Sequence, residues 1–280
     1  MIAEGHKRPI LIWLYTGAFL VFSMVMIGGI TRLTNSGLSM VEWKLIMGSI
    51  PPLSDTDWQE TFEKYQAFPE YKQINSNFSL EDFKGIFWWE YIHRTLGRFI
   101  GIVFIIPFLF FLIKKWLNPS LIKQLLLMLF LGGFQGFLGW FMVASGLVEN
   151  PHVSHFRLAA HLVTATIVLV YILWVAFSLN AEQTPESSAK VRGVTYLLIG
   201  IILLQITYGA FVAGLKAGFV FNTFPKMGSS WFPVAITTLE PFWTNFTQGL
   251  AGVQFVHRYL AYAVVVVVAW LWFIASKQEL

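Results

Sequence analysis

The sequence contains no cysteine and few charged residues. Without cysteine the chain cannot form disulfides, thiolate-held zinc sites or iron–sulfur clusters, and it has no cysteine nucleophile. Any metal must therefore be held by His, Met or carboxylate side chains. Charged residues make up 12% of the chain and hydrophobic residues 56%, whereas a soluble domain carries about a quarter charged residues. This balance is typical of a protein that lies in a lipid bilayer.

The small excess of positive charge does not indicate a nucleic-acid partner. The formal net charge is +4, but Lys and Arg are scattered among apolar segments and do not form a basic stripe. Residues 1–15 pass from a short basic stretch into an apolar one without a small-residue cleavage site, so we interpret them as the start of a retained helix. A bacterial inner membrane is the simplest location, with membrane lipid as the surrounding partner.

Long apolar segments predict an all-α polytopic membrane protein. A transmembrane helix needs about 20 mostly apolar residues. Basic residues flank the first span and two short connections, so the positive-inside rule predicts that both termini are cytoplasmic. The long outer loop, 32–86, contains a segment, 53–73, that predicts short amphipathic helices over the outer face. Six segments are predicted to span the membrane: about 9–30, 87–113, 120–143, 157–179, 193–215 and 253–275.

The first two spans resemble the last two, which indicates an internal duplication. The first span ends with GGITRLTNSGLSM (28–40) and the fifth with GAFVAGLKAGFVF (209–221), with glycines at matching positions. The second opens with EYIHRTLGR (90–98) and the sixth with QFVHRYLAY (254–262). We therefore predict a first four-helix unit, residues 1–179, followed by a partial second copy, residues 180–280.

Three of the six histidines lie just inside spans that begin on the outer side, at a similar predicted depth. A single intramembrane histidine is commonly a buried residue that is hydrogen-bonded to another helix. Three at one depth, each with an arginine nearby, favour a functional site. Imidazole is an axial ligand of haem iron, and cations bind haem propionates, whereas zinc or copper would not explain the arginines. The predicted iron ligands are His93, His161 and His257, and the predicted propionate contacts are Arg94, Arg98, Arg157 and Arg258.

Glu90 lies three residues before His93, on the same face of the predicted helix, and the repeat has Gln254 at this place. Both side chains can form hydrogen bonds, but only a carboxylate can carry negative charge or accept a proton. Glu90 is therefore the candidate catalytic residue. The alternative is a carboxylate that extends to the membrane surface and pairs with Arg94. Gly97, one turn after His93, fits close approach of a haem or simple helix packing.

Six segments of the chain resemble the haem A synthase family in its cysteine-free form: RLTNSGLSMVEW, FWWEYIHRTLGR, GFQGFLGWFMVASGL, RLAAHLVTA, GAFVAGLKAGFVFNTFPKMG and QFVHR. They extend through nearly the whole chain. The resemblance implies an oxidoreductase that converts the C8 methyl group of haem O into a formyl group by successive hydroxylations with water-derived oxygen. The product is haem A for cytochrome oxidase, and a resident haem b is the implied cofactor.

The resemblance also implies a role for each site residue. Haem O would lie between His93 and His161, Glu90 would be the catalytic carboxylate, and His257 would bind haem b with a further histidine. The spacing from His93 to His161, when counted from His257, ends beyond the last residue, Leu280. The further histidine is therefore not found in this sequence. A truncated sequence, a separate chain that supplies two more helices, and a haem b with one protein ligand are the three interpretations, of which we favour truncation. The implied partners are haem O synthase (a farnesyltransferase), cytochrome oxidase assembly factors and a second copy of the chain.

Two other functions fit parts of the sequence. A b-type cytochrome or haem-handling protein would use the same histidines, but it has no need of a carboxylate beside a haem ligand. A transporter built from repeats would carry its polar residues at mid-membrane on broken helices, whereas here they gather near one surface. Glu90 therefore favours the enzyme.

Overall fold

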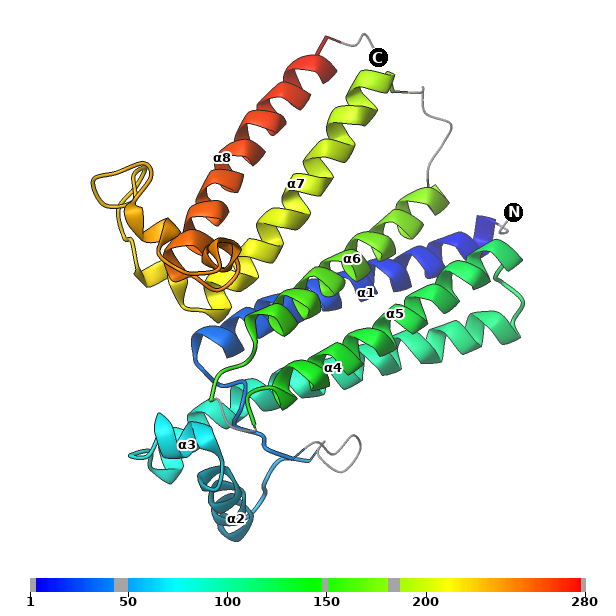
Figure 1. The fold of residues 1–280 in the computed structure, drawn as a ribbon. Helices are drawn as coiled ribbons and strands as arrows, with labels where there is room; N and C mark the ends of the chain where they lie inside the picture. Colours follow the sequence, from blue (N-terminus) through cyan, green and yellow to red (C-terminus); the bar gives the residue numbers. More distant parts are fainter. Residues whose placement is uncertain (1–3, 43–49, 148–150, 181–186, 278–280) are drawn as a thin grey trace. The chain divides into compact units, whose positions relative to one another are not determined.

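The computed structural model describes residues 4–42, 50–147, 151–180 and 187–277. Within these residues there is no sheet, and each of the six long helices is long and apolar enough to cross a membrane. The predicted all-α class with six spans is therefore confirmed (Figure 1). The long helices are α1 (Glu4–Leu33), α4 (Leu80–Ile113), α5 (Pro119–Ala144), α6 (His155–Asn180), α7 (Ala189–Gly214) and α8 (Leu250–Ala275).

Helix α4 begins at Leu80 and not at the predicted residue 87. The Ser79 hydroxyl accepts a hydrogen bond from the Asp82 backbone N–H at 3.2 Å, and the Asp82 carboxylate accepts one from the Ser79 N–H at 2.9 Å. This reciprocal capping box satisfies two helix-end donors, so it starts a helix whatever the hydropathy of the first turns. The polar first turns carry α4 beyond the apolar span that hydropathy alone detects.

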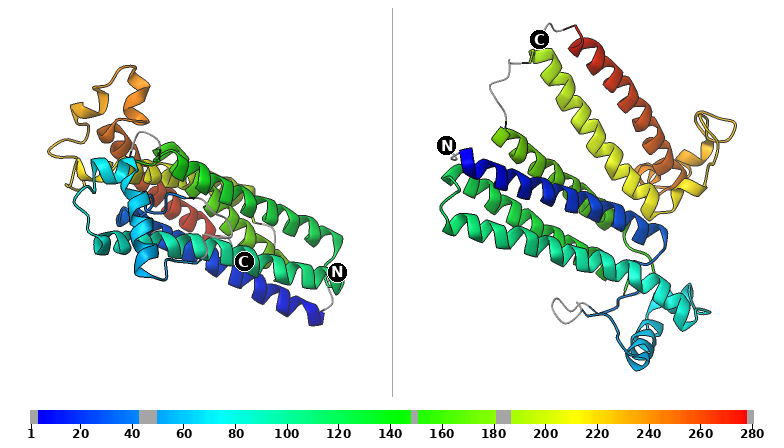
Figure 2. Two further views of the ribbon diagram at one scale, coloured as in Figure 1. Left: turned by 90° about the horizontal axis from the view of Figure 1, so that it is seen from below. Right: turned by 180° about the vertical axis from the view of Figure 1, so that it is seen from behind.

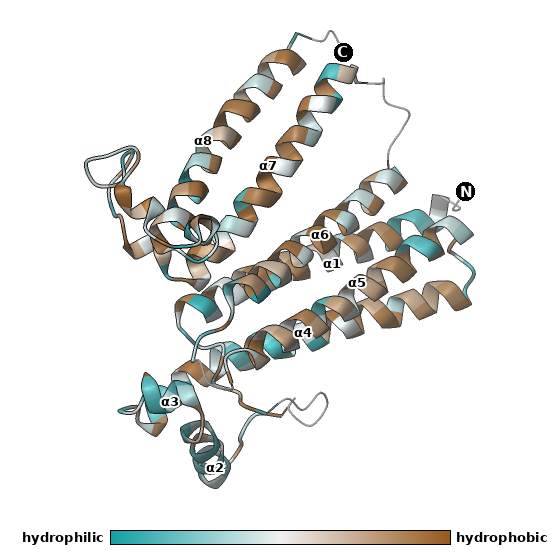
Figure 3. Ribbon diagram, viewed as in Figure 1, coloured by the Kyte–Doolittle hydropathy of each residue, from teal (hydrophilic) through white to brown (hydrophobic). Residues whose placement is uncertain are grey.

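The long helices expose large apolar side chains around their circumference. Phe19 and Phe130 are each 66% exposed and Trp272 is 71% exposed, and Figure 3 shows hydrophobic residues along all of these helices. In water, patches of this kind would promote association. Lipid tails are as apolar as these side chains, so the same exposure carries no penalty in a bilayer. The chain is accordingly a multi-pass membrane protein.

The chain divides into two compact units. The first comprises Met1–Ser154 with Thr164–Ala181, and the second comprises His155–Val163 with Glu182–Leu280. The predicted repeat units, 1–179 and 180–280, describe a duplication of sequence, and this assignment stays a prediction.

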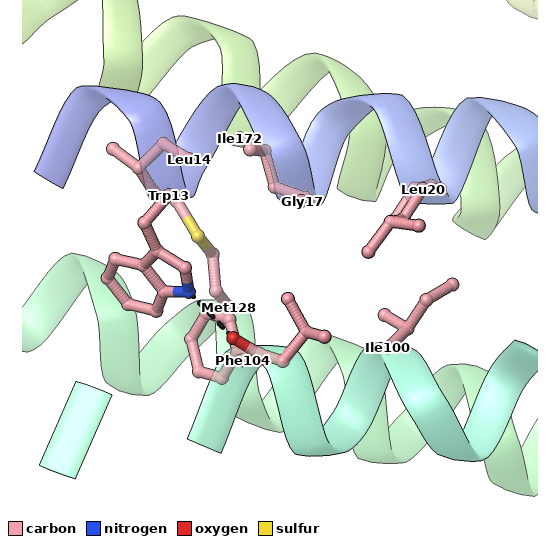
Figure 4. Close-up of a pocket in the computed structure, with 10 residues that line it drawn as sticks. Trp13, Leu14, Gly17, Leu20, Ile100, Phe104, Met128 and Ile172 are labelled. Atoms are coloured by element: carbon pink, nitrogen blue, oxygen red, sulfur yellow. Dashed lines mark hydrogen bonds between the residues drawn. The ribbon is translucent and has the colours of Figure 1, made fainter. Parts of the chain in front are cut away.

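In the first unit, α1, α4, α5 and the later turns of α6 surround one apolar core (Figure 2). Trp13 of α1 links two of these helices, because its indole N–H donates to the Val103 carbonyl of α4 at 2.9 Å (Figure 4). In an unbroken helix that carbonyl would accept from the residue four positions later, but this residue is Pro107, which has no N–H. Trp13 therefore satisfies an acceptor that proline leaves open in the membrane. A small apolar cavity of about 30 Å³ lies beside it.

Two short helices in the long outer loop, α2 (Asp55–Gln66) and α3 (Pro69–Gln73), confirm the helices predicted for residues 53–73. The buried face of α2, with Trp58 and Phe62, packs against Phe83 and Phe87 on the extended start of α4. Much of α2 and α3 consists of hydrophilic residues (Figure 3). The outer helices are thus fixed to α4 by an aromatic cluster.

A buried polar group lies within this aromatic cluster. The Tyr65 hydroxyl donates to the Glu70 carboxylate at 3.1 Å and accepts from the Asn75 amide at 2.8 Å. Burial, and after it the charge of Glu70, raise the pKa of the Tyr65 phenol, and the Asn75 hydrogen bond opposes this rise. The Glu90 carboxylate adds a smaller increase to the same pKa.

In the second unit α7 and α8 run side by side (Figures 1 and 2), and the connection between them contains three short 3₁₀ helices. Asn245 fixes this connection: its side-chain amide donates to the carbonyls of Leu239 and Phe242, each at 2.8 Å, and its oxygen accepts from the Leu239 N–H at 2.9 Å. Its backbone oxygen lies so close to Gly252 that no side chain fits there. The 3₁₀ helices are η2 (Ala217–Phe219), η3 (Val234–Thr237) and η4 (Phe242–Phe246).

Candidate functional site

Glu90 is a buried carboxylate that holds the chain segment following α1. Its side chain is 3% exposed. One oxygen, Oε2, accepts from the Ser39 hydroxyl at 2.7 Å and from the Met40 N–H at 2.8 Å. The other, Oε1, accepts from the Arg94 guanidinium at 2.5 Å. Hydrogen bonds and an opposite charge together offset the desolvation of this carboxylate.

Arg94 holds the same segment from the next turn of α4. Its guanidinium donates to the Met40 carbonyl at 2.8 Å and to the Glu42 carbonyl at 3.2 Å. We call residues 34–42 the first exit segment. Glu90 and Arg94 bind its backbone from both sides of Met40, so the exit segment and α4 form one rigid corner.

The second unit repeats this corner with an amide in place of the carboxylate. Gln254 on α8 donates to the Phe221 carbonyl at 2.9 Å and to the Gly218 carbonyl at 3.3 Å. Arg258 donates to the carbonyls of Phe221 and Thr223. We call residues 215–226 the second exit segment. The second corner thus uses an amide donor and an arginine, and it contains no negative charge.

The two corners occupy equivalent positions in the repeat. Met40 follows Gly37 by three residues, as Phe221 follows Gly218, and the two arginines bind the carbonyls of these residues and of the next residue but one. The glycine and histidine motifs therefore belong to one structural unit that is present twice. The position occupied by Glu90 and Gln254 changes its chemistry between the copies, and Ser39, which donates to Glu90, is replaced by Val220.

The histidines of both corners lie against a glycine of the preceding long helix. An ideal Cβ on Gly28 would lie 3.0 Å from Cε1 of His93, and one on Gly209 would lie 3.2 Å from Cε1 of His257. The Nδ1 atoms of both rings are buried. Each imidazole therefore lies directly on helix backbone, in the layer of its own corner.

The other predicted site residues take their places from α4 and α6. Arg98 lies one turn beyond Arg94 on α4, in the first unit. Arg157 and His161 lie on the first turns of α6, in a segment that belongs to the second unit. His161 is half-buried. Its pairing with His93 stays a prediction, as do the propionate contacts of the four arginines.

The ion pair with Arg94 that the alternative interpretation of Glu90 requires is present, and the carboxylate is buried within the protein. A Cβ at Gly97 would lie 3.2 Å from the methyl carbon of the flexible Met24 side chain, and the choice between close approach of a haem and helix packing stays a prediction.

Two polar residues near these corners, Ser39 and His155, were not among the predicted site residues. Ser39 contributes a hydroxyl to Glu90, and its place within the repeated glycine segment was the available signal. The His155 ring nitrogen Nε2 lies 2.8 Å from the Thr247 carbonyl oxygen, which connects the start of α6 to the turn before α8. No sequence signal predicts this bond, because its acceptor is a backbone carbonyl.

Comparison with known proteins agrees with these motifs. The family model described as cytochrome oxidase assembly protein (COX15-CtaA) matches residues 11–280. A Heme A synthase of Flavobacterium psychrophilum is 49% identical over 279 residues, which cover 98% of this chain and 82% of the relative. A Heme A synthase of Nitrosospira multiformis is 46% identical over 270 residues, covering 95% of this chain and 76% of the relative. No solved structure matches the chain. The match through nearly all of the sequence shows that this chain belongs to the COX15-CtaA family.

Proposed function

We propose that this chain is a heme A synthase, an oxidoreductase that converts the C8 methyl group of haem O into the formyl group of haem A. Family membership and the name of the full-length relatives support the proposal. Each hydroxylation breaks a C–H bond, joins oxygen from water to the methyl carbon and passes two electrons to an electron acceptor, with release of two protons. The second hydroxylation gives a geminal diol, which loses water to form the formyl group. The product is haem A for cytochrome oxidase.

The observation that carries the proposal is the buried Glu90 carboxylate, one helical turn from His93. An ionisable group inside a membrane helix is expensive and usually functional. A carboxylate has about four lone-pair sites, and Ser39, Met40 and Arg94 occupy three of them. The remaining capacity can accept a proton from the substrate. The negative charge of the Glu90 carboxylate would also stabilise positive charge that develops at the methyl carbon.

We propose that His93 and His161 are the axial ligands of haem O and that His257 is a ligand of haem b. Haem iron accepts an imidazole nitrogen as a ligand. The surroundings of the His93 ring on α4 and of the His257 ring on α8 suit this role. Each ring lies against a glycine of the preceding long helix, with its Nδ1 atom buried. When bound, haem b supplies one-electron transfer.

The four arginines Arg94, Arg98, Arg157 and Arg258 are the proposed partners of the haem propionates, because guanidinium groups bind carboxylates strongly. Arg94 and Arg258 donate to exit-segment carbonyls.

We further propose a bacterial inner-membrane location with cytoplasmic termini, which the basic residues at the predicted cytoplasmic ends support. Haem O synthase, which makes the farnesylated substrate, cytochrome oxidase assembly factors and a second copy of the chain are the proposed partners.

Expression in a bacterium that makes haem O but no haem A tests the proposed function. Chromatography of extracted haems should show haem A only when the chain is present. A chain that accumulates haem b and leaves haem O unchanged would instead be a b-type cytochrome, and this result would overturn the proposal.

A further inference from the structure

Gly28 on α1 and Gly209 on α7 present bare backbone to the edge of an imidazole ring. Built Cβ atoms at these positions would lie 3.0 Å from Cε1 and 3.5 Å from Nδ1 of His93, and 3.2 Å and 3.8 Å from the same atoms of His257. Carbon atoms in favourable contact are about 3.5–4.0 Å apart. Alanine therefore fits at neither position unless the ring or the helix moves by a few tenths of an ångström.

The helices that carry the two rings are not free to move away. Glu90 and Arg94, which flank His93 on α4, are hydrogen-bonded to Met40. Met40 follows Gly28 in the same continuous segment, so α4 is fixed to the helix end that carries the glycine. A methyl group at Gly28 would therefore displace the imidazole.

The second corner restrains its helix in the same way. Gln254 and Arg258, which flank His257 on α8, are hydrogen-bonded to Phe221 of the segment that follows Gly209. The same restraint acts on both histidines even though the hydrogen-bonding groups differ. Displacement of the ring is thus the expected response in both corners.

We propose that Gly28 and Gly209 are positioning residues that set the place and tilt of the imidazoles of His93 and His257. This inference rests on the proposed function, in which these imidazoles bind haem iron. A metal ligand must be held within about 0.5 Å of its productive place, and a displacement of a few tenths of an ångström is of that size.

Two other glycines, one on each of the same two helices, provide matched controls. Gly29 on α1 and Gly200 on α7 have no atom within 4 Å of an added Cβ. Gly97 tests a different point, because its close contact is the end of a flexible methionine, Met24. Alanine at Gly97 should be tolerated, since the Met24 side chain can change its rotamer.

The experiment compares the full chain with its Gly28→Ala, Gly209→Ala, Gly29→Ala, Gly200→Ala and Gly97→Ala variants, purified in detergent. Supporting groups of metal ligands typically contribute about 10- to 100-fold to affinity. We expect Gly28→Ala and Gly209→Ala each to weaken binding of added haem by about 10-fold at the affected histidine and to change the electron paramagnetic resonance signal of its iron. The three control variants should match the wild type. Wild-type affinity and spectrum in both test variants would overturn the inference.

A double-mutant comparison separates the ring contact from a general folding defect. Gly28→Ala should lower the unfolding temperature in the wild-type background but not in a His93→Ala background, where no ring is present to displace. Equal shifts in both backgrounds would contradict the inference. This measurement requires no haem A production, so the inference and the proposed function can fail separately.

Discussion

Glu90 and Arg94 form a 2.5 Å ion pair on adjacent turns of α4, and both side chains are less than a tenth exposed. The pair holds Met40 from its N–H and its carbonyl. In the second corner, Gln254 and Arg258 hold Phe221 through its carbonyl alone. An amide therefore holds the equivalent residue of the second corner without a charge. This difference supports the proposed catalytic role of the Glu90 carboxylate.

The predicted iron ligands of the substrate site can be tested by removal. His93→Ala and His161→Ala should each abolish haem A production, because haem O would lose an axial ligand in either variant. His6→Ala is the control. His6 lies near the start of α1, where its ring stacks on Trp116, and it is not a predicted iron ligand. This variant should keep normal production. Haem A from both ligand variants at the wild-type amount would contradict the assignment.

Trp13 and Pro107 should be coupled through the Val103 carbonyl. Trp13→Phe leaves this carbonyl without its indole donor, and an unsatisfied buried acceptor costs about 1–3 kcal/mol. In a Pro107→Ala background residue 107 can donate to the same carbonyl, so the cost of Trp13→Phe should fall. Thermal unfolding of the four proteins in detergent measures the coupling. Equal losses in both backgrounds would show that Trp13 contributes only by packing.

The Tyr65 hydroxyl should stabilise the outer helices. Tyr65→Phe removes one partner from Glu70 and one from Asn75 in a buried cluster, and we expect a loss of about 1–3 kcal/mol in local stability. Limited proteolysis of the outer loop measures this loss as faster cleavage. Tyr71→Phe is the matched control, because its hydroxyl accepts a part-exposed bond from Gln66. Similar cleavage of the two variants would contradict the prediction.

The start of α2 should loosen at low pH. Hydrogen bonds from the Ser54 N–H and hydroxyl, and then from the Leu53 N–H, lower the pKa of the Asp57 carboxylate. Because the pKa of Asp57 is lower in the folded than in the unfolded chain, these bonds stabilise α2 at pH values above the ordinary aspartate pKa of about 3.9. That stability is lost as the pH falls through the folded pKa. Hydrogen-exchange protection of the first turn should therefore fall with acidification in the wild type, but not in Asp57→Asn. The same pH dependence in both proteins would assign the effect to another group.

The sequence was sufficient for the fold because membrane spans are set by length and hydropathy, which are visible along the chain. Hydropathy placed the start of α4 too late along the chain. The Ser79 capping box lies in a segment that is too polar to be recognised as part of an apolar span. For the site, helical periodicity predicts that Glu90, His93 and Arg94 are neighbours. The bonds from Ser39 and from the Met40 backbone depend on an irregular segment, whose path has no periodic signature. The contact of Gly28 with His93 depends on how two helices pack, which the repeated motif alone does not specify.

Glu90 is the proposed catalytic residue, and Gln254 provides the internal reference. In Glu90→Gln the amide oxygen can still accept from Ser39 and Met40, whereas the amide NH2 faces the Arg94 guanidinium and the ion pair is lost. We expect the corner to retain its haem, and the haem content of the purified variant checks this. The amide cannot accept a proton or stabilise positive charge well. Gln254→Glu should leave the reaction in the first corner and serves as the reciprocal control.

The most direct measurement is chromatography of the haems extracted from cells that carry Glu90→Gln, Gln254→Glu or the wild-type chain at equal protein levels. We expect haem O or its singly hydroxylated product in Glu90→Gln, and haem A in the other two. Haem A at the wild-type amount from Glu90→Gln would contradict this expectation and would leave Glu90 as a structural partner of Arg94 and the first exit segment.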